Sequence, residues 1–338
     1  MAGEFEGTGG LMRVAVTGGT GFVGSHVVEL LLARGHEVNC LVVPSRGTLW
    51  LEGASVRFFE GSVTDSSVLP AFLEGCEAIV NIAGLTRARN EELFLSVNRD
   101  GAVKLVEAAL SLPRGPRQII SMSSEAAMGP TPEGEKSVET DPMRPLTPYG
   151  RSKMALEVAL KPYYDDGRMR CTFIRAPGVY GPRDRDFLQY FKLVKHGLRI
   201  IVGDRSVMSL VYVKTLAAAI ESCLGNPAAY DQTFFVADEG EYDWDDFSSM
   251  VEKALGKKTL RIQVPEWFVA VAAFCAEIVK PFCRRPPLLD RNKLLEVRQH
   301  RWVLSTAKAK SLLRFEPVAA TSDAIAETAR WYLDHEWI

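Results

Sequence analysis

The sequence lacks the residue patterns of a disulfide framework or a structural metal site. Its six cysteines are scattered without a Cys-x-x-Cys pair, and none lies in a histidine-rich stretch, since the chain has only five histidines. Such spacing excludes the common zinc motifs and is typical of reduced, mostly buried thiols. We therefore expect a cytoplasmic protein without a bound metal.

An excess of charge of either sign is also missing. The formal net charge is -2, from 40 Lys and Arg residues against 42 Asp and Glu residues. A nucleic-acid-binding protein needs a basic surface that attracts phosphate groups, so the composition gives no electrostatic support for a nucleic-acid partner.

Long hydrophobic runs are absent as well. The most apolar stretch, residues 264–276, is followed by Glu277 and is shorter than the ~20 residues that span a bilayer, so we expect no transmembrane segment. Three interpretations of this stretch stay open: a buried helix, a wall for a hydrophobic substrate, and a patch that rests on a membrane surface. Residues 1–11 lack the features of a signal peptide and are interpreted as a flexible leader.

Near its start the sequence contains a strand, a turn with three spaced glycines, and a helix. A β-branched run ends at Thr17, and apolar periodicity from residue 22 to residue 32 indicates the helix. In between, Gly18 permits a tight turn, Gly21 lets the backbone approach a pyrophosphate, and Gly24 lets helix and strand pack closely. Free N–H groups at a helix start attract phosphate, so the pattern predicts a dinucleotide site. Its expected contacts are Gly18, Thr20, Gly21, Phe22, Val23 and Gly24.

Strands and helices alternate along the first half of the chain. Patterns predict further strands at 37–43, 56–60, 77–82, 117–122 and 170–175, with helices at 22–34, 66–74, 91–110 and 149–164. This alternation requires a parallel sheet covered on both faces. We therefore expect an α/β fold with a Rossmann-type, doubly wound parallel sheet, whose ligand crevice lies at the carboxyl ends of the strands.

The second half is expected to add a smaller, mostly helical substrate domain. The chain leaves the sheet near residues 176–182, strands are predicted at 207–213 and 233–236 around a helix at 215–224, and the segment from 243 onward is predicted to be mainly helical. We expect an NAD(P)-binding domain formed by 12–178 with about 209–238. The substrate-binding domain is expected at about 179–208 with 239–338.

Two features indicate chemistry at that crevice. Tyr149 and Lys153 are four residues apart on one predicted helix face, where a nearby ammonium lowers the pKa of a phenol from its usual value of ~10. Ser123 and Ser124 end the fifth predicted strand, where Ser124 could donate a hydrogen bond to a substrate oxygen; alternatively, both serines only cap the strand.

These features belong to a set of ordered motifs that resembles the extended short-chain dehydrogenase/reductase family. The motifs are Thr-Gly-x-x-Gly-x-x-Gly, Asn-x-Ala-Gly, Ser-Ser before Gly129, Pro-Tyr-Gly-x-Ser-Lys and Arg-x-Pro-x-Val-Tyr-Gly-Pro. The resemblance implies that Tyr149 is the general acid and base, that Lys153 lowers its pKa and holds the nicotinamide ribose, and that Ser124 polarises the reacting oxygen with Ser123 as a helper. It also implies a structural role for Asn98. Further cofactor contacts implied by the resemblance are Ser62, Ala83, Gly84, Pro177 and Val179.

The end of the second strand bears on the choice of cofactor. NAD-preferring relatives carry an acidic residue there for the adenosine ribose, whereas this chain has Val42 and Val43. Arg46, with Ser45, could meet the 2′-phosphate of NADP, or it could be an ordinary solvated arginine. We expect NADP to be favoured over NAD.

The substrate is expected to be hydrophobic. Where relatives that act on nucleotide sugars grip a diphosphate, this chain has Gly178 and Met208, and the dehydratase acid pair is replaced by Glu125 and Ala126. Segments at 129–134, 289–293 (followed by Trp302) and 330–332 instead resemble the 3β-hydroxysteroid dehydrogenase and ketone reductase branch. Candidate substrate contacts are Thr86, Arg87, Ser124 and Tyr180.

The sequence thus predicts an NAD(P)-dependent oxidoreductase that interconverts a ketone and a secondary alcohol on a hydrophobic small molecule. Two alternatives stay open: a nucleotide-sugar epimerase or dehydratase with tightly held NAD, and a non-enzymatic protein that senses NADP. The resemblance also suggests a homodimer formed through the helices at 91–110 and 149–164.

Overall fold

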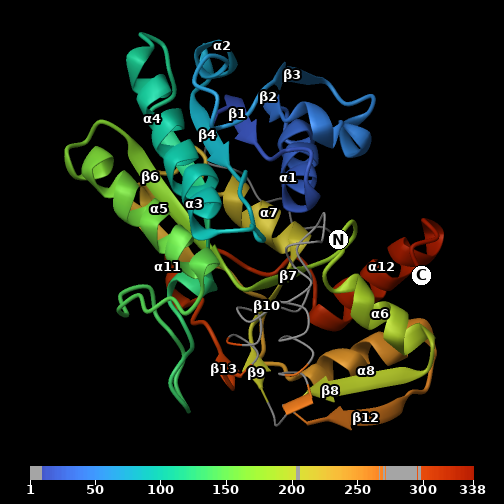
Figure 1. Cartoon of the computed structure of the whole chain (residues 1–338). Coiled ribbons are helices and arrows are strands. Elements are labelled where there is room, and N and C mark those ends of the chain that lie inside the picture. The colour runs from blue at the N-terminus through green and yellow to red at the C-terminus, as the bar shows by residue number, and fades with distance from the viewer. Residues whose placement is uncertain (1–9, 203–205, 266, 269–270, 272–294, 296–297) are drawn as a thin grey trace.

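The computed structural model describes residues 10–202, 206–265, 267–268, 271, 295 and 298–338. At its centre is a sheet of seven strands in the order β11-β6-β5-β4-β1-β2-β3 (Figure 1). Every neighbouring pair in it is parallel. The strand order reverses between β1 and β4, the place where doubly wound sheets open a ligand crevice. The strands are β1 (Arg13–Thr17), β2 (Glu37–Val42), β3 (Val56–Glu60), β4 (Ala78–Asn81), β5 (Gln118–Ser124), β6 (Arg170–Ala176) and β11 (Gln232–Phe235).

Helices cover both faces of the sheet because its inner strands are apolar on both sides. In β1, Val14 and Val16 contribute to the apolar cluster on one face, and Ala15 contributes to the cluster on the other. The first face carries α1 (Phe22–Ala33), α7 (Val213–Glu221) and α11 (Ala307–Leu313), and the second carries α2 (Leu69–Leu73), α4 (Gly101–Ser111) and α5 (Pro148–Asp165). The expectation of a Rossmann-type, doubly wound α/β sheet is therefore confirmed.

The long helix expected at 91–110 is interrupted by a π-helical turn. It consists of α3 (Glu91–Phe94), the π-helical turn Leu95–Asp100, and α4. Such turns hold an extra residue and are frequent at functional sites. Here the turn contains Asn98, which is 2% exposed and bonded to the loop that follows β4.

Beyond β6 the chain forms a further apolar cluster outside the large sheet. The parallel strands β7 (Gly178–Tyr180) and β10 (Leu210–Tyr212) pack there with α6 (Leu188–Lys195), α8 (Trp244–Leu255) and α12 (Thr321–Asp334). Figure 1 shows these helices together, below and beside the sheet. Fully buried aromatic side chains dominate this cluster, namely Tyr180, Phe191, Tyr212, Phe247 and Tyr332.

Short strands here depart from the expected helical pattern. β8 (Leu198–Val202) pairs with β12 (Leu260–Val264), and β9 (Val207–Met208) pairs with β13 (Arg301–Trp302). The strand expected at 207–213 is split at Ser209, whose backbone N–H bonds to Trp302 and whose hydroxyl accepts from Leu304. β12 carries a period-two alternation, Leu-Arg-Ile-Gln-Val, which is the pattern of a strand rather than a helix.

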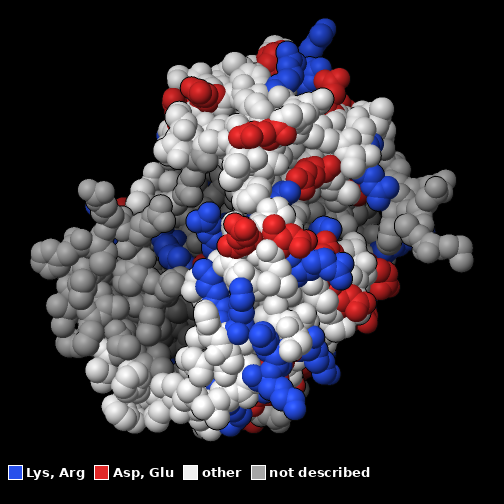
Figure 2. All heavy atoms as spheres, turned by 90° about the vertical axis from the view of Figure 1, so that its right-hand side faces the viewer, with Lys and Arg blue, Asp and Glu red and all other residues white. Residues whose placement is uncertain are grey.

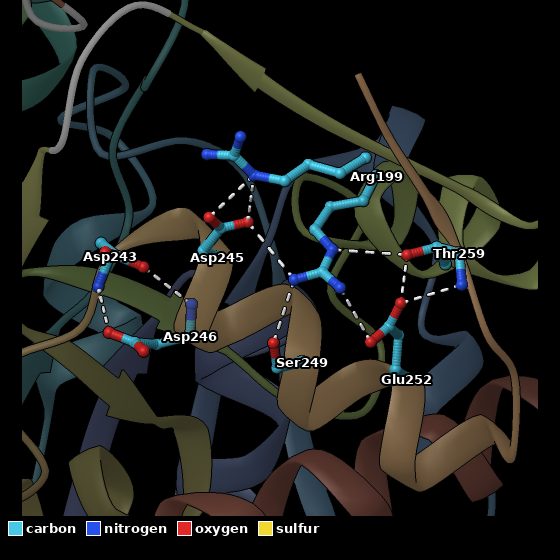
Figure 3. A network of polar contacts seen from close by, with 8 residues as sticks. Arg199, Asp243, Asp245, Asp246, Ser249, Glu252 and Thr259 are labelled. Atoms are coloured by element: carbon cyan, nitrogen blue, oxygen red, sulfur yellow. Dashed lines mark hydrogen bonds and ion pairs between the residues drawn. The ribbon is translucent and has the colours of Figure 1, made fainter. Parts of the chain in front are cut away.

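An ion-pair network attaches β8 and β12 to α8 (Figure 3). The Arg199 guanidinium lies between Asp245, at 3.3 Å, and Glu252, at 3.0 Å. Arg261 of β12 also binds Asp245, at 3.0 Å. Since individual pairs near the surface stabilise little, the network's main effect is to fix the orientation of the two strands on α8. The helix itself begins with a capping box of Asp243 and Asp246.

Charges of both signs share the face that includes these elements. Figure 2 shows Lys and Arg side chains mostly on the lower half of that face, at the height of α6, α8 and β12, and Asp and Glu side chains toward its middle and top. None of the helices within the described ranges combines the length and apolar character that a membrane-crossing segment needs.

Some sequence expectations fall on residues that the structure does not describe. In the apolar stretch at 264–276, Trp267, Phe268 and Val271 are exposed, and most other positions lie outside the described residues. Its three interpretations therefore stay open. The motif at 289–293 and residues 1–9 of the expected leader also lie outside the described residues.

Candidate active site

The glycine turn between β1 and α1 is built around close backbone contacts. Gly18 has φ +71°, a conformation that side chains rarely adopt. A Cβ atom at Gly24 would lie 2.1 Å from the Gly18 carbonyl oxygen, so only glycine lets the helix start this close to the turn. At Gly21 a Cβ atom would lie 3.2 Å from the same oxygen.

This turn fits the phosphates of a dinucleotide. α1 begins after Gly21 with no side-chain cap and no acidic residue in its first turn. Its first N–H groups therefore remain for an anion, which the helix dipole also attracts. Thr20, Phe22 and Val23 lie at the same helix start and are half-buried.

Beside the turn, β1 and β4 are joined at their carboxyl ends. Thr17 Oγ1 donates to Asn81 Oδ1 at 2.7 Å and accepts from the Ala83 N–H at 3.2 Å. A Cβ atom at Gly18 would lie 2.7 Å from the Ala83 nitrogen. The glycine turn and the loop after β4 are therefore in contact at the switch point of the sheet.

Asn98 connects that loop to α5. Its amide donates to Leu85 O at 3.1 Å and to Ser152 Oγ at 2.9 Å, and it accepts from the Leu85 N–H at 2.7 Å. A Cβ atom at Gly84 would lie 3.2 Å from Asn98 Oδ1 and 3.3 Å from Lys153 Nζ. The predicted residues Ala83, Gly84 and Lys153 are thus brought together, and Asn98 fixes their spacing.

Tyr149 and Lys153 lie one turn apart at the start of α5. The Lys153 ammonium lies 5.9 Å from the centre of the Tyr149 ring, and the half-buried ring also lies 6.1 Å from that of Phe94. Lys153 is 5% exposed and donates to Met122 O of β5 at 2.7 Å. Burial lowers its pKa to about 8, while the negative charge of Glu157 acts in the opposite direction.

The two serines at the end of β5 differ in their contacts. Ser124 Oγ accepts from the Ala126 N–H at 3.2 Å and so caps the short turn Glu125–Ala127. Ser123 Oγ donates to Glu157 Oε1 at 2.5 Å. Ser124 is 9% exposed at the carboxyl end of the strand, whereas Ser123 is committed to a buried contact.

The remaining predicted cofactor residues lie in segments that follow β2, β3 and β6. Ser62 follows β3 and bonds Thr64 at 3.0 Å. Pro177 is buried between β6 and β7, and Val179 is half-buried in β7. Arg46 belongs to a short 3-10 turn, Pro44–Arg46, that follows β2, and its side chain is not among the described ones.

Of the predicted substrate contacts, Thr86 and Arg87 are exposed in the loop after β4. Arg87 forms an ion pair with Asp186 at 2.5 Å, which joins this loop to the segment before α6.

Tyr180 requires a correction. Its side chain is fully buried, and its hydroxyl donates to Asp238 Oδ2 at 2.9 Å. Asp238 also accepts from the Tyr212 N–H at 2.8 Å, so Tyr180 serves to hold β7, β10 and the segment after β11 together. Burial raises the pKa of Tyr180, and the hydroxyl stays protonated. A side chain without accessible surface offers none to a substrate.

The sequence analysis missed Glu157 and quoted Arg175 in a motif without giving it a role. Glu157 on α5 and Arg175 on β6 form a buried ion pair at 2.6 Å. Two signals were available in the sequence. Arg175 lies inside a buried strand, where an arginine needs a partner, and Glu157 follows Lys153 by four residues, beside the apolar positions 156 and 160.

Comparison with known proteins identifies the family. Residues 14–237 match the model of the NAD-dependent epimerase/dehydratase family. The chain belongs to this family. The prediction from the ordered motifs is therefore confirmed, and the protein is an NAD(P)-dependent enzyme that acts on CH–OH groups.

Relatives within the family have different activities. The chain is 25% identical to a ceramide reductase of Caulobacter vibrioides over 326 residues, which cover 96% of each chain. It is 28% identical to a 3-beta-hydroxysteroid dehydrogenase of Mycolicibacterium neoaurum over 347 residues, covering 96% of this chain and 92% of the relative. The structure of Thermus thermophilus UDP-glucose 4-epimerase in complex with NAD matches with a TM-score of 0.77 and 26% identity, covering 95% of this chain and 99% of the other.

The glycine geometry predicts the effect of Gly24→Ala. Alanine normally stabilises a helix by up to about 1 kcal/mol relative to glycine. Here the contact at 2.1 Å is with backbone, which cannot move aside cheaply. The steric cost of the added methyl group, about 2–3 kcal/mol, should therefore exceed this gain, and urea unfolding should show that the variant is less stable than the wild type. NADPH binding, followed by fluorescence, should weaken as well.

Gly10→Ala is the matched control, because a Cβ atom at Gly10 meets nothing within 4 Å. It should leave both measurements unchanged. Equal stability of the Gly24→Ala and Gly10→Ala variants would contradict the proposed packing constraint.

Proposed function

We propose that the protein is an NADP-dependent oxidoreductase that interconverts a ketone and a secondary alcohol on a hydrophobic small molecule. The observation that carries the proposal is the place of Lys153, which lies near the Tyr149 ring and Gly84 and bonds Met122 O of the strand that ends at Ser124. A proton donor, a cation and a hydroxyl at one place are the groups that carbonyl reduction requires.

In the proposed arrangement, the glycine turn and the start of α1 hold the pyrophosphate, and Lys153 holds the nicotinamide ribose. When bound, the nicotinamide supplies or accepts the hydride. Tyr149 donates a proton to the carbonyl oxygen during reduction and removes it during oxidation. Lys153 stabilises the phenolate that is left, because a cation favours the charged form of a neighbouring phenol. The Ser124 hydroxyl donates a hydrogen bond to the same substrate oxygen.

Support for a lipid-like substrate comes from the site positions and from the relatives. Gly178 and Met208 stand where a nucleotide-sugar diphosphate would need polar side chains, and a Cβ atom at Gly178 would already lie 3.2 Å from the Phe187 ring. The ceramide reductase and the 3-beta-hydroxysteroid dehydrogenase are named for apolar substrates. We propose that the substrate lies between the sheet and the cluster of α6, α8 and α12. The NAD(P)-binding domain then comprises 12–178 and about 209–238, and the substrate-binding domain comprises about 179–208 and 239–338.

We also infer a cytoplasmic homodimer. α3 and α4 lie beside α5 on one face (Figure 1), and this face exposes the apolar residues Leu93 and Val158. The four described cysteines are buried free thiols, which suit a reducing compartment. Sedimentation that finds only monomers would exclude the dimer, and recovery from a non-cytoplasmic fraction would exclude the location.

Turnover should depend on the Tyr149 hydroxyl. Tyr149→Phe keeps the ring but removes the proton donor, so we expect at least a 100-fold loss of kcat with NADPH and a panel of apolar ketones, and unchanged NADPH affinity. The loss is measured by nicotinamide absorbance. Tyr163→Phe is the matched control, since Tyr163 lies on the same helix and donates only to Glu107, at 3.1 Å.

The epimerase in the family gives a second candidate, and the fate of the cofactor separates the two. A reductase exchanges its nicotinamide with solution during turnover, whereas an epimerase keeps and recycles it. Full turnover by Tyr149→Phe would contradict the proposed mechanism. Purification with one tightly held NAD per chain, together with activity on a nucleotide sugar, would favour the epimerase.

Cofactor choice should depend on Arg46. Arg46→Ala removes the cation that we assign to the 2′-phosphate, so we expect the KM for NADPH to rise about tenfold and the KM for NADH to stay constant. Arg114→Ala is the control, because Arg114 is exposed before β5, at the opposite end of the strands. Equal effects of Arg46→Ala on both cofactors would contradict the NADP preference.

A further inference from the structure

A buried carboxylate lies one helical turn beyond Lys153. Glu157 is 6% exposed, and its two oxygens accept three hydrogen bonds. Arg175 donates to it from Nε at 2.9 Å and from Nη2 at 2.6 Å, and Ser123 donates at 2.5 Å. Helix α5 is thereby attached to β5 and β6 by the same side chain.

Arg175 extends this attachment to the loop that precedes α5. Its Nη1 donates to Glu139 O at 3.1 Å and contacts the sulfur of Met128 at 2.8 Å. The Glu139 carboxylate in turn accepts from the Phe235 N–H of β11 at 2.9 Å. The Arg175 guanidinium therefore joins β6 to α5 and to the loop before it, and Glu139 of that loop bonds β11.

Stability alone does not account for such a pair. Removing two charges from water is expensive, and a buried ion pair can often be replaced by apolar side chains without loss of stability. The position of this pair suggests another reason. Met122 accepts from the Lys153 ammonium and the adjacent Ser123 donates to Glu157, so two consecutive residues of β5 hold the two buried charged groups of α5.

We propose that Glu157 is a positioning residue of the active site. It fixes on β5 the helical turn of α5 that carries Lys153, and its negative charge is shared by two buried cations, Lys153 and Arg175. The proposal rests on the function assigned above to Lys153. It goes beyond that assignment because it explains how a buried ammonium keeps its charge.

The groups that face Lys153 determine whether a substitution of Glu157 raises or lowers the pKa of Lys153. Tyr149 and Glu157 lie on its own helix, β6 contributes Arg175 beside Glu157, and β5 and the loop after β4 present the neutral Met122 carbonyl and Gly84. Burial lowers the pKa of Lys153 to about 8, and Glu157 raises it. Among the groups just named, Glu157 carries the one negative charge, and Glu157→Gln removes it while keeping the side chain's shape, so the pKa of Lys153 should fall further, by about one unit.

A double-mutant cycle tests the coupling without any cofactor. Urea unfolding is measured at pH 7 and pH 10 for the wild type, Glu157→Gln, Lys153→Met and the double variant. At pH 7 Lys153 is charged in the wild type and about half charged in Glu157→Gln, so the coupling should be about 1.0 kcal/mol, a roughly fivefold change in the unfolding equilibrium. At pH 10 Lys153 is neutral in the folded protein, so the coupling should disappear. Coupling that is absent at pH 7, or equal at both pH values, would overturn the proposal.

If Glu157→Gln alone does not fold, the cycle is repeated in an Arg175→Met background, where no buried guanidinium is left unpaired. In that background too, coupling that is absent at pH 7, or equal at pH 7 and pH 10, would overturn the proposal. Ser123→Ala serves as the control, because it removes one hydrogen bond from Glu157 without a change in charge. Its coupling to Lys153→Met should be small and independent of pH.

NADPH affinity between pH 6 and pH 9.5 gives the functional readout. Affinity that depends on charged Lys153 is lost as the pH rises through its pKa. The midpoint of this pH dependence should lie about one pH unit lower in Glu157→Gln. The variant should therefore bind NADPH about fivefold more weakly than the wild type at pH 8, and about equally at pH 6. Glu157→Asp keeps the charge and should restore the wild-type midpoint.

The outcomes separate the two proposals. A wild type that binds no dinucleotide refutes the proposed function, while the cofactor-free cycle still decides the role of Glu157. A wild type that binds NADPH, with the same midpoint for Glu157→Gln, overturns the role of Glu157 alone.

Discussion

The arrangement of the site depends on how one helix is held against the ends of two strands. α5 carries Tyr149 and Lys153, and its attachment to β5 and β6 runs through the bidentate contact between Arg175 and Glu157 and the hydrogen bond from Ser123. Such a contact is directional, whereas apolar packing allows small rotations of a helix. The apolar residues of α5 hold it on the sheet, and the buried charges define its rotation.

A second constraint is the close approach of backbones at the switch point. The contacts of Gly18 and Gly24 leave no space for a Cβ atom, and Asn98 spaces the loop after β4 from α5. The first constraint acts on α5, and the second acts where the glycine turn meets the loop after β4. One shapes the phosphate end of the proposed cofactor site and the other shapes its reactive end, so that a small displacement of either would separate Lys153 from Gly84.

The parts of the fold that were predictable are those with a local physical signal. Buried parallel strands give continuous apolar runs, and the glycine turn has few structural alternatives, so the sheet and the start of α1 followed from the residues. The π-helical turn around Asn98 gives no such signal, because its hydrogen bonds shift without a change in apolar periodicity. Strand β12 was missed because its alternation is short and lies in a segment with helical neighbours.

For the candidate site, sequence patterns indicated residues but not their surroundings. Tyr180 was assigned to the pocket from its motif, whereas its hydroxyl is turned to Asp238 inside an aromatic cluster that forms only when distant segments meet. Glu157 was overlooked for the same reason, since it lies on a helix and its partner Arg175 lies 18 residues away on a strand. Pairing between elements is a property of the tertiary fold, and local periodicity does not report it.

The central claim is that α5 presents Tyr149 and Lys153 to a nicotinamide at the carboxyl ends of the sheet. A crystal structure of the protein with NADP⁺ is the most direct measurement. We predict the pyrophosphate at the start of α1, the nicotinamide ribose within hydrogen-bond distance of Lys153, and the ring beside the Tyr149 hydroxyl. A dinucleotide bound elsewhere, or a Tyr149 hydroxyl turned away from the ring, would contradict it.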